Sequence, residues 1–506
     1  MRNAAGSEPR SAERSAGAVL EAYCAAFRRR GLEEILALFT LDAVFEIPLE
    51  PAPLVGREAI ARVLKGAFLG LDEIEVWLEH LLDAKDTAVA EGVFRARMVG
   101  VPPHVDGTPA RLDFKFVIAC EIEEGLIRRW SEYFDTRPLR PRERARLYPI
   151  TRRSPYWDGT VQAGVQDFMV YNHTYFPLTY LRAPAEEYLA LTEAVTLWDV
   201  ACERQTEVRG PDAAALVDYL TTRKVDDLPV GACRYTLVCD PEGRIMCDPV
   251  LLHPWPDVYW LSHGDVDLTL WARGLALGRR LEVVVSEPDV APLQVQGPKA
   301  LEVLRGLTEM PLEELGRYKC QATRVAGVPA VVSRTGWSGG PGYEVFPLSS
   351  ERALHLWQAL LEAGRPHGLR VTGPNINRAV EKGVTDTSYY SNSDLNPFEA
   401  GHERLVDLEK GEFVGRAALE GIARAGAARK TVGLRASEPL PLLEWYWPVE
   451  SAGRRVGEVR WACHSFALGA PVAIAVVERA LERDAALTIV HGGGRTPARI
   501  VDFPFL

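Results

Sequence analysis

The chain lacks an apolar run long enough to cross a membrane. Its longest uniformly apolar stretch is Ala470–Val477, whereas a membrane-spanning helix needs about 20 such residues. The first residues, M-R-N-A-A-G-S-E-P-R-S-A-E-R, also lack the hydrophobic core of a secretory signal. We therefore expect a cytoplasmic protein with no membrane partner.

The chain also lacks a basic charge balance and paired cysteines. With 58 Lys and Arg against 69 Asp and Glu, the net charge is −11, so no overall basic field attracts nucleic-acid phosphates. Eight cysteines with no C-x-x-C pair indicate neither a disulfide framework nor a zinc site. H-E-x-x-H and other clustered ligand sets are missing too. From the charge we therefore expect no nucleic-acid partner, and from the missing ligand sets no metal.

What the chain has is length, which predicts several domains. Single hydrophobic cores usually stop growing at about 250–300 residues, and this chain has 506. Composition and periodicity predict a disordered tail over 1–14, an α+β domain over 15–136, a linker over 137–154, a second α+β domain over 155–425 and a small β-barrel over 426–506. The linker is a basic run punctuated by prolines, which is more typical of a solvated connection than of an anion site.

In the first of these domains, helices precede strands. Two stretches of helical spacing within Ala18–Phe39 meet at Gly31, and several long strand-like runs follow, the last over Leu126–Phe134. This order, with W-S-E-Y-F-D at Trp130–Asp135, resembles the SnoaL-type branch of the cone-shaped nuclear-transport-factor-2-like superfamily. If the implied cone pocket is catalytic, its candidate acids are Asp113, Glu132 and Asp135. The alternative is that they are charged residues on a solvated face of the sheet or in structural hydrogen bonds.

The second domain contains a glycine-rich turn, S-R-T-G-W-S-G-G-P-G-Y-E-V-F over Ser333–Phe346. Apolar, β-branched residues flank it, so we predict a strand-turn-strand unit. Glycines let a backbone approach a ligand closely. Glu344, beside Trp337 and Tyr343, could hold a flat heterocycle with adjacent N–H donors. The alternative is an ordinary hairpin with an exposed Glu.

Several segments from Tyr171 to Leu506 share their order with one family. This joint order resembles the folate-binding family of the glycine-cleavage T-protein (aminomethyltransferase), and most of all its dimethylsulfoniopropionate demethylase branch. Besides the glycine-rich turn and the closing D-F-P-F-L, the segments are Y-N-H-T-Y-F-P (Tyr171–Pro177), L-W-D-V-A-C-E-R-Q-T-E-V-R-G-P-D-A (Leu197–Ala213), Y-T-L-V-C-D-P-E-G-R-I-M-C-D-P-V (Tyr235–Val250), W-L-S-H-G-D-V-D (Trp260–Asp267), P-L-Q-V-Q-G-P-K (Pro292–Lys299), N-P-F-E-A-G (Asn396–Gly401) and F-V-G-R-A-A-L (Phe413–Leu419).

The resemblance implies tetrahydrofolate as the cosubstrate and assigns residues to it. Glu344 matches the carboxylate that holds the pterin ring, which presents an N–H and an amino group side by side. Trp337 and Tyr235 match aromatic walls of the folate cavity, and Tyr343 is expected nearby. Asp248 falls at the catalytic Asp position; without the resemblance, it could simply cap a turn.

The chain departs from the family in three places. Glycine-cleavage proteins have D-V-S-H-M where this chain has D-V-A-C-E-R, and a second Asp where it has Cys247; both changes resemble the demethylase side. The family places an Arg that supports the folate tail at the position of Ala379. Arg378, one place earlier, is the substitute that the sequence offers.

The implied chemistry moves a methyl group to N5 of tetrahydrofolate. A methyl on a sulfonium or quaternary centre leaves easily because the leaving group departs neutral, and Asp248 would orient N5 or accept its proton. Aromatic walls suit a cationic donor. The candidate wall residues are Tyr171, Tyr175, Phe176, Trp337, Trp445, Tyr446 and Trp447. The cluster Trp445–Trp447 could instead pack between domains.

A methyl ether donor would need an acid for its leaving oxygen, and His173 or His464 could serve. The sequence therefore predicts a tetrahydrofolate-dependent demethylase acting on a small onium or other methylated metabolite. Three alternatives stay open: an aminomethyltransferase, an aryl methyl ether O-demethylase and a non-catalytic folate-binding regulator. The N-terminal domain could bind the donor, handle the product or form a homodimer.

Overall fold

The computed structural model describes residues 15–50, 52–99, 111–135, 151–180, 184–385, 387–390, 394–443 and 445–506. The predicted tail over 1–14 and most of the predicted linker lie outside these residues. The chain divides into two compact units, residues 1–146 and 147–506. Among the helices of the described residues, none combines the length and the apolar character that crossing a membrane requires.

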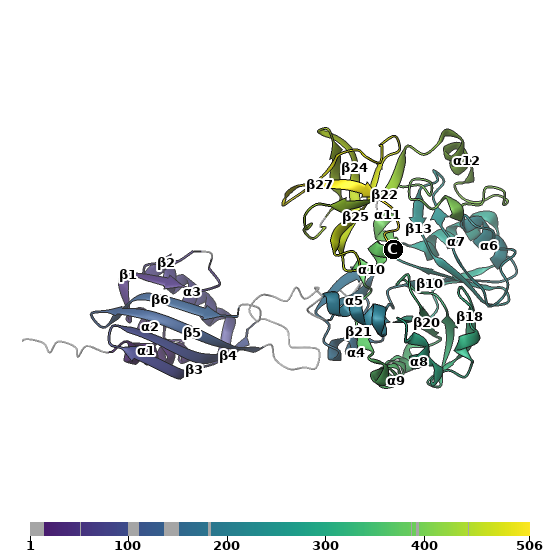
Figure 1. Cartoon of the computed structure of the whole chain (residues 1–506). Helices are drawn as coiled ribbons and strands as arrows, with labels where there is room; N and C mark the ends of the chain where they lie inside the picture. The colour runs from purple at the N-terminus through teal and green to yellow at the C-terminus, as the bar shows by residue number, and fades with distance from the viewer. Residues whose placement is uncertain are drawn as a thin grey trace, which may run out of the picture. The chain divides into compact units, whose positions relative to one another are not determined.

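The described residues of the first unit form three helices and a six-stranded sheet (Figure 1). The strand order is β2-β1-β6-β5-β4-β3, antiparallel except for the parallel pair β1 and β6. Helices precede most of the sheet, as predicted. The elements are α1 (Ala16–Arg28), α2 (Leu32–Leu36), β1 (Phe39–Glu46), β2 (Leu54–Val55), α3 (Arg57–Gly70), β3 (Leu71–Ala84), β4 (Thr87–Met98), β5 (Arg111–Glu123) and β6 (Leu126–Phe134).

Aromatic side chains fill the interior of this unit. Alternate residues of β5, including Phe116 and Ile118, are buried, because successive side chains of a strand point to opposite faces. Trp130 on β6 is fully buried, with its ring centroid 4.2 Å from that of Tyr23 on α1 and 5.9 Å from that of Phe45 on β1. Such ring pairs stabilise a core beyond the area they bury.

The second unit begins with two sheets flanked by helices. One sheet has the order β11-β14-β15-β10-β16 and the other β18-β19-β20-β17-β9-β21. Its elements up to the barrel are α4 (Trp157–Gln162), β7 (Asp167–Tyr171), β8 (Thr174–Thr179), α5 (Pro184–Glu193), β9 (Thr196–Asp199), β10 (Arg204–Arg209), α6 (Ala213–Leu220), β11 (Cys233–Tyr235), β12 (Val238–Cys239), β13 (Ile245–Cys247), β14 (Val250–Trp255), β15 (Val258–His263), α7 (Leu268–Arg279), β16 (Val284–Ser286), β17 (Leu293–Gln296), α8 (Ala300–Arg305), β18 (Cys320–Val325), β19 (Val328–Ser333), β20 (Gly342–Pro347), α9 (Ala353–Gly364), β21 (Arg370–Val371), α10 (Ile376–Lys382), α11 (Thr387–Tyr390) and α12 (Arg416–Ala425).

A closed six-stranded barrel ends the chain, as the strand-only pattern beyond Gly426 predicts (Figure 1). Its strands follow the order β22-β25-β24-β23-β26-β27. They are β22 (Arg429–Ala436), β23 (Trp447–Ser451), β24 (Arg454–Ser465), β25 (Ala470–Glu478), β26 (Leu487–His491) and β27 (Gly494–Val501). The longest apolar run of the sequence, Ala470–Val477, lies within β25, and its side chains are mostly buried.

The glycine-rich turn joins β19 to β20, so the predicted strand-turn-strand unit is present. In the antiparallel sheet, Glu344 of β20 lies opposite Ser333 of β19 and opposite Gln294 of β17. Gly336 within the turn has φ +154°, and a Cβ there would lie 2.2 Å from Nε2 of Gln296. The turn therefore lies tight against the sheet and needs glycine at this place.

Candidate active site

The second unit holds a cavity of about 720 Å³. Four of the predicted site residues line it together: Tyr235 at the end of β11, Asp248 just after β13, Trp337 in the glycine-rich turn and Glu344 on β20. These positions are far apart in the sequence, and the two sheets with the turn bring them to one hollow. A concave site with a few converging polar groups is the usual form of a small-molecule site.

Glu344 is a buried carboxylate held by neutral donors. Gln294 Nε2 donates to its Oε1 at 2.8 Å, and the Thr335 hydroxyl donates to its Oε2. Burial raises the pKa of Glu344, and hydrogen bonds from Thr335, Gln294 and Ser333 oppose that rise. A carboxylate offers about four lone-pair positions, so Glu344 can still accept the two adjacent N–H groups at a pterin edge. The residues present therefore fit the expected cosubstrate.

Gln294 organises this wall of the cavity. Besides Glu344, its Nε2 lies 3.4 Å from Oε1 of Glu203, and its Oε1 accepts the backbone N–H of Trp337 at 3.2 Å. One amide therefore positions a carboxylate, an aromatic ring and the turn that carries it. Sequence reasoning missed this role, although a fully buried glutamine in the apolar strand P-L-Q-V-Q was a usable signal.

Asp248 is oriented by Tyr235, whose hydroxyl donates to its Oδ2 at 2.6 Å. Burial raises the pKa of Tyr235 well above its ordinary value, and the charge of Asp248 adds to the rise. Tyr235 therefore stays a hydroxyl that donates to a carboxylate. The neighbouring Cys247 points into the core and is fully buried.

Aromatic side chains form much of the remaining wall. Tyr171 and Phe176 line the cavity from β7 and β8, with ring centroids 6.2 Å apart. Trp445 and Tyr446 line it from the segment before β23. Trp447, the third of these consecutive aromatic residues, is instead buried in the core of the barrel. Tyr175 is likewise buried, with its ring centroid 5.7 Å from that of Trp157.

Besides Tyr175 and Trp447, four predicted site residues are not among the described residues that line the cavity. His173 is exposed in the turn between β7 and β8, at φ +58°. Tyr343 is buried in the core cluster on the other face of β20, because it is the strand neighbour of Glu344. The guanidinium of Arg378 lies 3.4 Å from Oε2 of the buried Glu381. His464, the second candidate acid, is exposed.

Two histidines that sequence reasoning missed do line the cavity, His263 and His402. Burial lowers the pKa of each to about 4. His263 Nε2 lies 3.0 Å from the Thr206 hydroxyl, and His402 Nε2 lies 2.7 Å from the Tyr390 hydroxyl. Both imidazoles are therefore neutral near pH 7 and are poor donors of a proton to a leaving oxygen. His402 directly follows the N-P-F-E-A-G segment.

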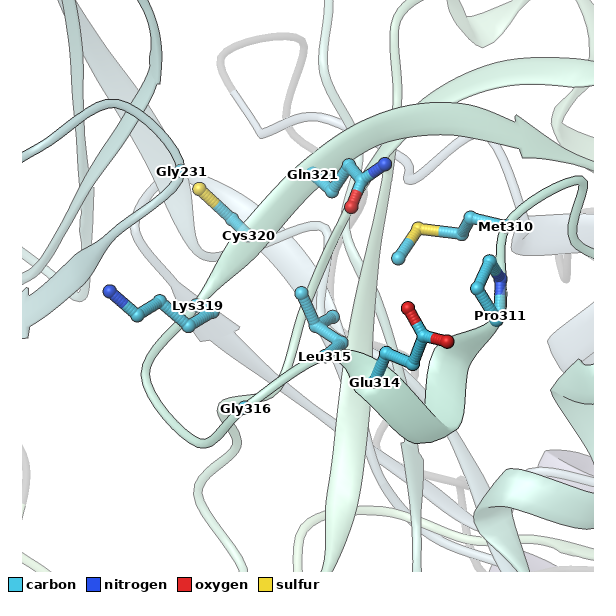
Figure 2. A pocket seen from close by; sticks show the side chains of 9 residues that line it. All are labelled: Gly231, Met310, Pro311, Glu314, Leu315, Gly316, Lys319, Cys320 and Gln321. Carbon is cyan, nitrogen blue, oxygen red and sulfur yellow. The ribbon is translucent and has the colours of Figure 1, made fainter.

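A second hollow of about 360 Å³ lies where β18 begins (Figure 2). Its lining includes Glu314, Lys319 and Cys320, and none of the predicted site residues lines it. Figure 2 shows the Cys320 side chain directed toward Gly231, away from Glu314. With the sulfur buried, this hollow offers mainly aliphatic and exposed charged groups.

The candidate acids of the first unit differ in environment. Asp113 is exposed and pairs with Arg95 at 3.0 Å, and Asp135 is exposed as well. Glu132 accepts from Trp130 Nε1 at 3.3 Å, and burial raises its pKa to about 7. The fold therefore alters the protonation of Glu132 strongly.

Comparison with known proteins gives matches over both units. The model described as "GCVT N-terminal domain" matches residues 158–410, and "Glycine cleavage T-protein C-terminal barrel domain" matches 429–506. "SnoaL-like domain" matches residues 20–130. These matches confirm the predicted fold class of both units and of the terminal barrel.

Curated relatives and a solved structure agree with the family models. The chain is 35% identical to dimethylsulfoniopropionate demethylase of Ruegeria pomeroyi, over 66% of this chain and 92% of the relative. It is 33% identical to an aminomethyltransferase of Moorella thermoacetica, over 70% of this chain and 97% of that relative. The aminomethyltransferase T structure of Bartonella henselae superposes with a TM-score of 0.62 at 22% identity, over 70% of this chain and 98% of that one, which shows the fold.

Proposed function

We propose that this chain, which belongs to the glycine-cleavage T-protein family, transfers a methyl group from a small onium compound or another methylated metabolite to N5 of tetrahydrofolate. The observation that carries the proposal is the joint placement of Asp248 and Glu344 on one cavity. One carboxylate, held by Gln294, suits recognition of the pterin edge. The other, held by Tyr235, suits a proton acceptor near N5.

Positioning supplies most of the rate in this mechanism. The N5 lone pair attacks the methyl carbon, and the bond between methyl and sulfur or nitrogen breaks with its electron pair going to the leaving atom. Holding both substrates in line can contribute about 7–11 kcal/mol at best. N5 then carries a proton that it must lose, and Asp248 accepts it.

The wall chemistry favours an onium donor over a methyl ether. Tyr171, Phe176 and Trp337 line the cavity, and an aromatic face stabilises a cation by about 0.5–2 kcal/mol. An ether would require an acid at its oxygen. His263 and His402, the two histidines of the lining, are held neutral by burial, and His173 is an exposed turn residue.

An aminomethyltransferase is the second candidate, because several curated relatives of similar identity bear that name. It would form 5,10-methylene-tetrahydrofolate rather than 5-methyl-tetrahydrofolate. Against it stand Ala201 and Cys202, which replace the family's Ser and His; Cys202 lines the cavity. A folate-binding regulator without turnover is the alternative outside enzymes.

For the domains, we propose the limits 15–136, 155–425 and 426–506, with the first domain binding the donor or product or forming a homodimer. The cytoplasm is the proposed compartment. Tetrahydrofolate and a small methyl donor are the proposed partners, and nucleic acid is not. The domain limits, the compartment and the role of the first domain are not needed for the methyl transfer itself, which the residues of the second unit would carry out.

The test is to identify the folate product by mass spectrometry. Purified full-length protein is incubated with tetrahydrofolate and a donor panel of sulfonium, quaternary ammonium, aryl ether and aminomethyl compounds. We expect 5-methyl-tetrahydrofolate with at least one onium donor. Methylene-tetrahydrofolate from the aminomethyl donor would favour the second candidate, and tight folate binding without product across the panel would favour the regulator.

A matched acid control separates chemistry from folding. Asp240, near Asp248 in sequence, accepts from Arg244 Nε at 2.7 Å and does not line the cavity. Asp240→Asn should therefore leave product formation unchanged, whereas Asp248→Asn should reduce it. Equal activity of the two variants would contradict the role proposed for Asp248.

A further inference from the structure

Two carboxylates share one amide nitrogen on the wall of the cavity. Glu203 and Glu344 both line the hollow, and both lie near the side chain of Gln294. Its Nε2 is 2.8 Å from Oε1 of Glu344 and 3.4 Å from Oε1 of Glu203. A single NH2 nitrogen therefore lies within hydrogen-bond distance of two carboxylates, which sets the spacing between their oxygens.

The amide of Gln294 is held in one orientation. Gln294 is 1% exposed and lies opposite Glu344 in the sheet. Its Oε1 accepts the backbone N–H of Trp337 at 3.2 Å. Because the amide is planar and its oxygen is engaged by the glycine-rich turn, the NH2 group faces the two acids. The spacing of the carboxylates is therefore part of the fold.

The backbone of Glu203 is held in place as well. Glu203 closes the turn between β9 and β10, where its N–H donates to the carbonyl of Val200 at 2.8 Å. Its own carbonyl accepts from Nε2 of Gln205 at 3.0 Å, and Gln205 is 1% exposed. The direction in which the Glu203 side chain leaves the turn is thus fixed before a ligand binds.

The cation next to Glu203 in the sequence is paired elsewhere. Arg204 Nε donates to Oε2 of Glu287 at 2.8 Å, and Arg204 is not among the described residues that line the cavity. Glu287 also accepts from Arg152 at 2.6 Å. The turn therefore presents an acidic group to the cavity and a basic group to Glu287.

The 2-amino group of a pterin suits this spacing. Like the amide NH2 of Gln294, it has two N–H bonds on one nitrogen, and the ring N3–H lies beside it. With its two oxygens, Glu344 can accept N3–H and one amino N–H. The second amino N–H points away from N3 and needs another acceptor once the ring has left water. Glu203, on the other side of the shared nitrogen, supplies that acceptor.

We propose that Glu203 and Glu344 together recognise the 2-amino group of tetrahydrofolate, each accepting one of its N–H bonds. The proposal rests on the proposed function, because it concerns the same cosubstrate. It adds a specificity, since a ring without a donor at this position leaves a carboxylate facing the ligand with no hydrogen bond to it. The cavity should therefore select 2-amino pteridines.

Calorimetric titration of the full chain with two ligands tests this assignment. The ligands are tetrahydrofolate and its 2-desamino-2-methyl analogue, which keeps N3–H but has no amino group; weak binding of the analogue is measured by competition. Glu203→Met should raise the Kd for tetrahydrofolate about 10- to 100-fold and change that for the analogue less than about twofold. Methionine is of similar length, and D-V-S-H-M has it at this place. Glu203→Gln, which keeps an acceptor oxygen, should lose less affinity than Glu203→Met.

The analogue separates direct contact from an effect through Gln294. If Glu203 only positioned Gln294, and through it Glu344, the methionine variant would weaken both ligands equally, because the analogue still needs Glu344 for its N3–H. Equal weakening of both ligands, or an unchanged Kd for tetrahydrofolate, would overturn the assignment.

Arg204→Met is the control in the same turn. It removes a charge that does not face the cavity, and Glu287 keeps Arg152 as a partner. Both Kd values should stay within about twofold of wild type. A loss as large as that of Glu203→Met would assign the effect to the turn rather than to the carboxylate, and would also overturn the proposal.

These titrations need no methyl donor, so they are independent of the product assay. Binding of tetrahydrofolate without methyl transfer would contradict the proposed function and leave the recognition of the amino group intact. Conversely, 5-methyl-tetrahydrofolate from the wild type, together with the same Kd for tetrahydrofolate in wild type and Glu203→Met, would uphold the proposed function and contradict this assignment.

Discussion

The two units each hold a carboxyl group whose pKa burial raises, Glu132 and Glu344, in different surroundings. In the first unit, Glu132 lies beside a closely packed aromatic core around Trp130 and accepts a hydrogen bond from Trp130 Nε1 at 3.3 Å. In the second, Glu344 borders a cavity of about 720 Å³ and accepts from Gln294 and Thr335. Burial raises the pKa of both groups.

The difference teaches that burial of an acid does not by itself indicate a site. Glu344 has room in front of it, and its donors oppose the effect of burial, so it remains able to accept from a ligand. Glu132 has a carboxyl whose protonation the fold favours, which affects stability. We therefore expect substitutions in the second unit to change chemistry and binding, and those in the first to change stability.

The largest effect should come from Asp248→Asn. Asparagine keeps the shape and still accepts from Tyr235, but it cannot take up a proton. Methyl transfer should slow by about 100- to 1,000-fold, within the range for general-base groups, with the Kd for tetrahydrofolate almost unchanged. Single-turnover kinetics with mass-spectrometric detection measure this; a loss confined to folate affinity would instead make Asp248 a binding residue.

Glu344→Gln should weaken the binding of tetrahydrofolate. The amide replaces one acceptor oxygen by a donor, and hydrogen bonds to a charged partner contribute about 1.5–3 kcal/mol, so the Kd should rise about 10- to 100-fold. Calorimetric titration measures it. Glu207→Gln is the control, because Glu207 is also buried but accepts from Trp260 Nε1 at 2.8 Å; the same loss there would contradict the assignment.

Glu132→Gln should change how stability depends on pH. Since the pKa of Glu132 is raised from 4.5 to about 7 in the folded chain, the native state holds the proton more tightly, and stability falls as pH rises from about 4.5 to 7. Allowing for partial exposure, the loss should be about 1–2 kcal/mol. Melting temperatures of the full chain at pH 5 and pH 8 should lose this difference in the variant, and methyl transfer should persist.

The smallest effect should come from Asp113→Asn. Asp113 and Arg95 form an ion pair at 3.0 Å with both side chains about half exposed, and such surface pairs contribute about 0–1 kcal/mol. Neither the melting temperature nor the product should change measurably. A loss of activity here would break the comparison, because it would place a working acid on the outer face of the first unit.

The sequence allowed most of the fold to be predicted, because strand alternation and the position of glycines report local structure directly. It also identified Asp248, Glu344, Trp337 and Tyr235 as residues of one cavity by resemblance. Tyr343 was placed on the wrong face, although neighbours in a strand must point opposite ways. That error could have been avoided from the sequence alone.

The positions of Gln294 and His402 at the cavity could not be predicted in this way. Gln294 acts because β17 pairs with β20 and brings its amide beside Glu344. His402 lines the cavity because an irregular segment returns to Tyr390. Both depend on contacts between distant parts of the chain, which local patterns do not specify; for Gln294 the sequence signal is a polar side chain within an apolar strand.

The two glutamines of β17 also decide when the glycine-rich turn becomes ordered. Gln294 accepts from the backbone of Trp337, and Gln296 accepts from the Ser338 hydroxyl at 2.6 Å and lies 3.3 Å from the carbonyl of Thr335. The conformational entropy of this turn is therefore lost during folding rather than at ligand binding. Association should be limited by entry into the cavity, and the turn amides should exchange with solvent slowly before any ligand arrives.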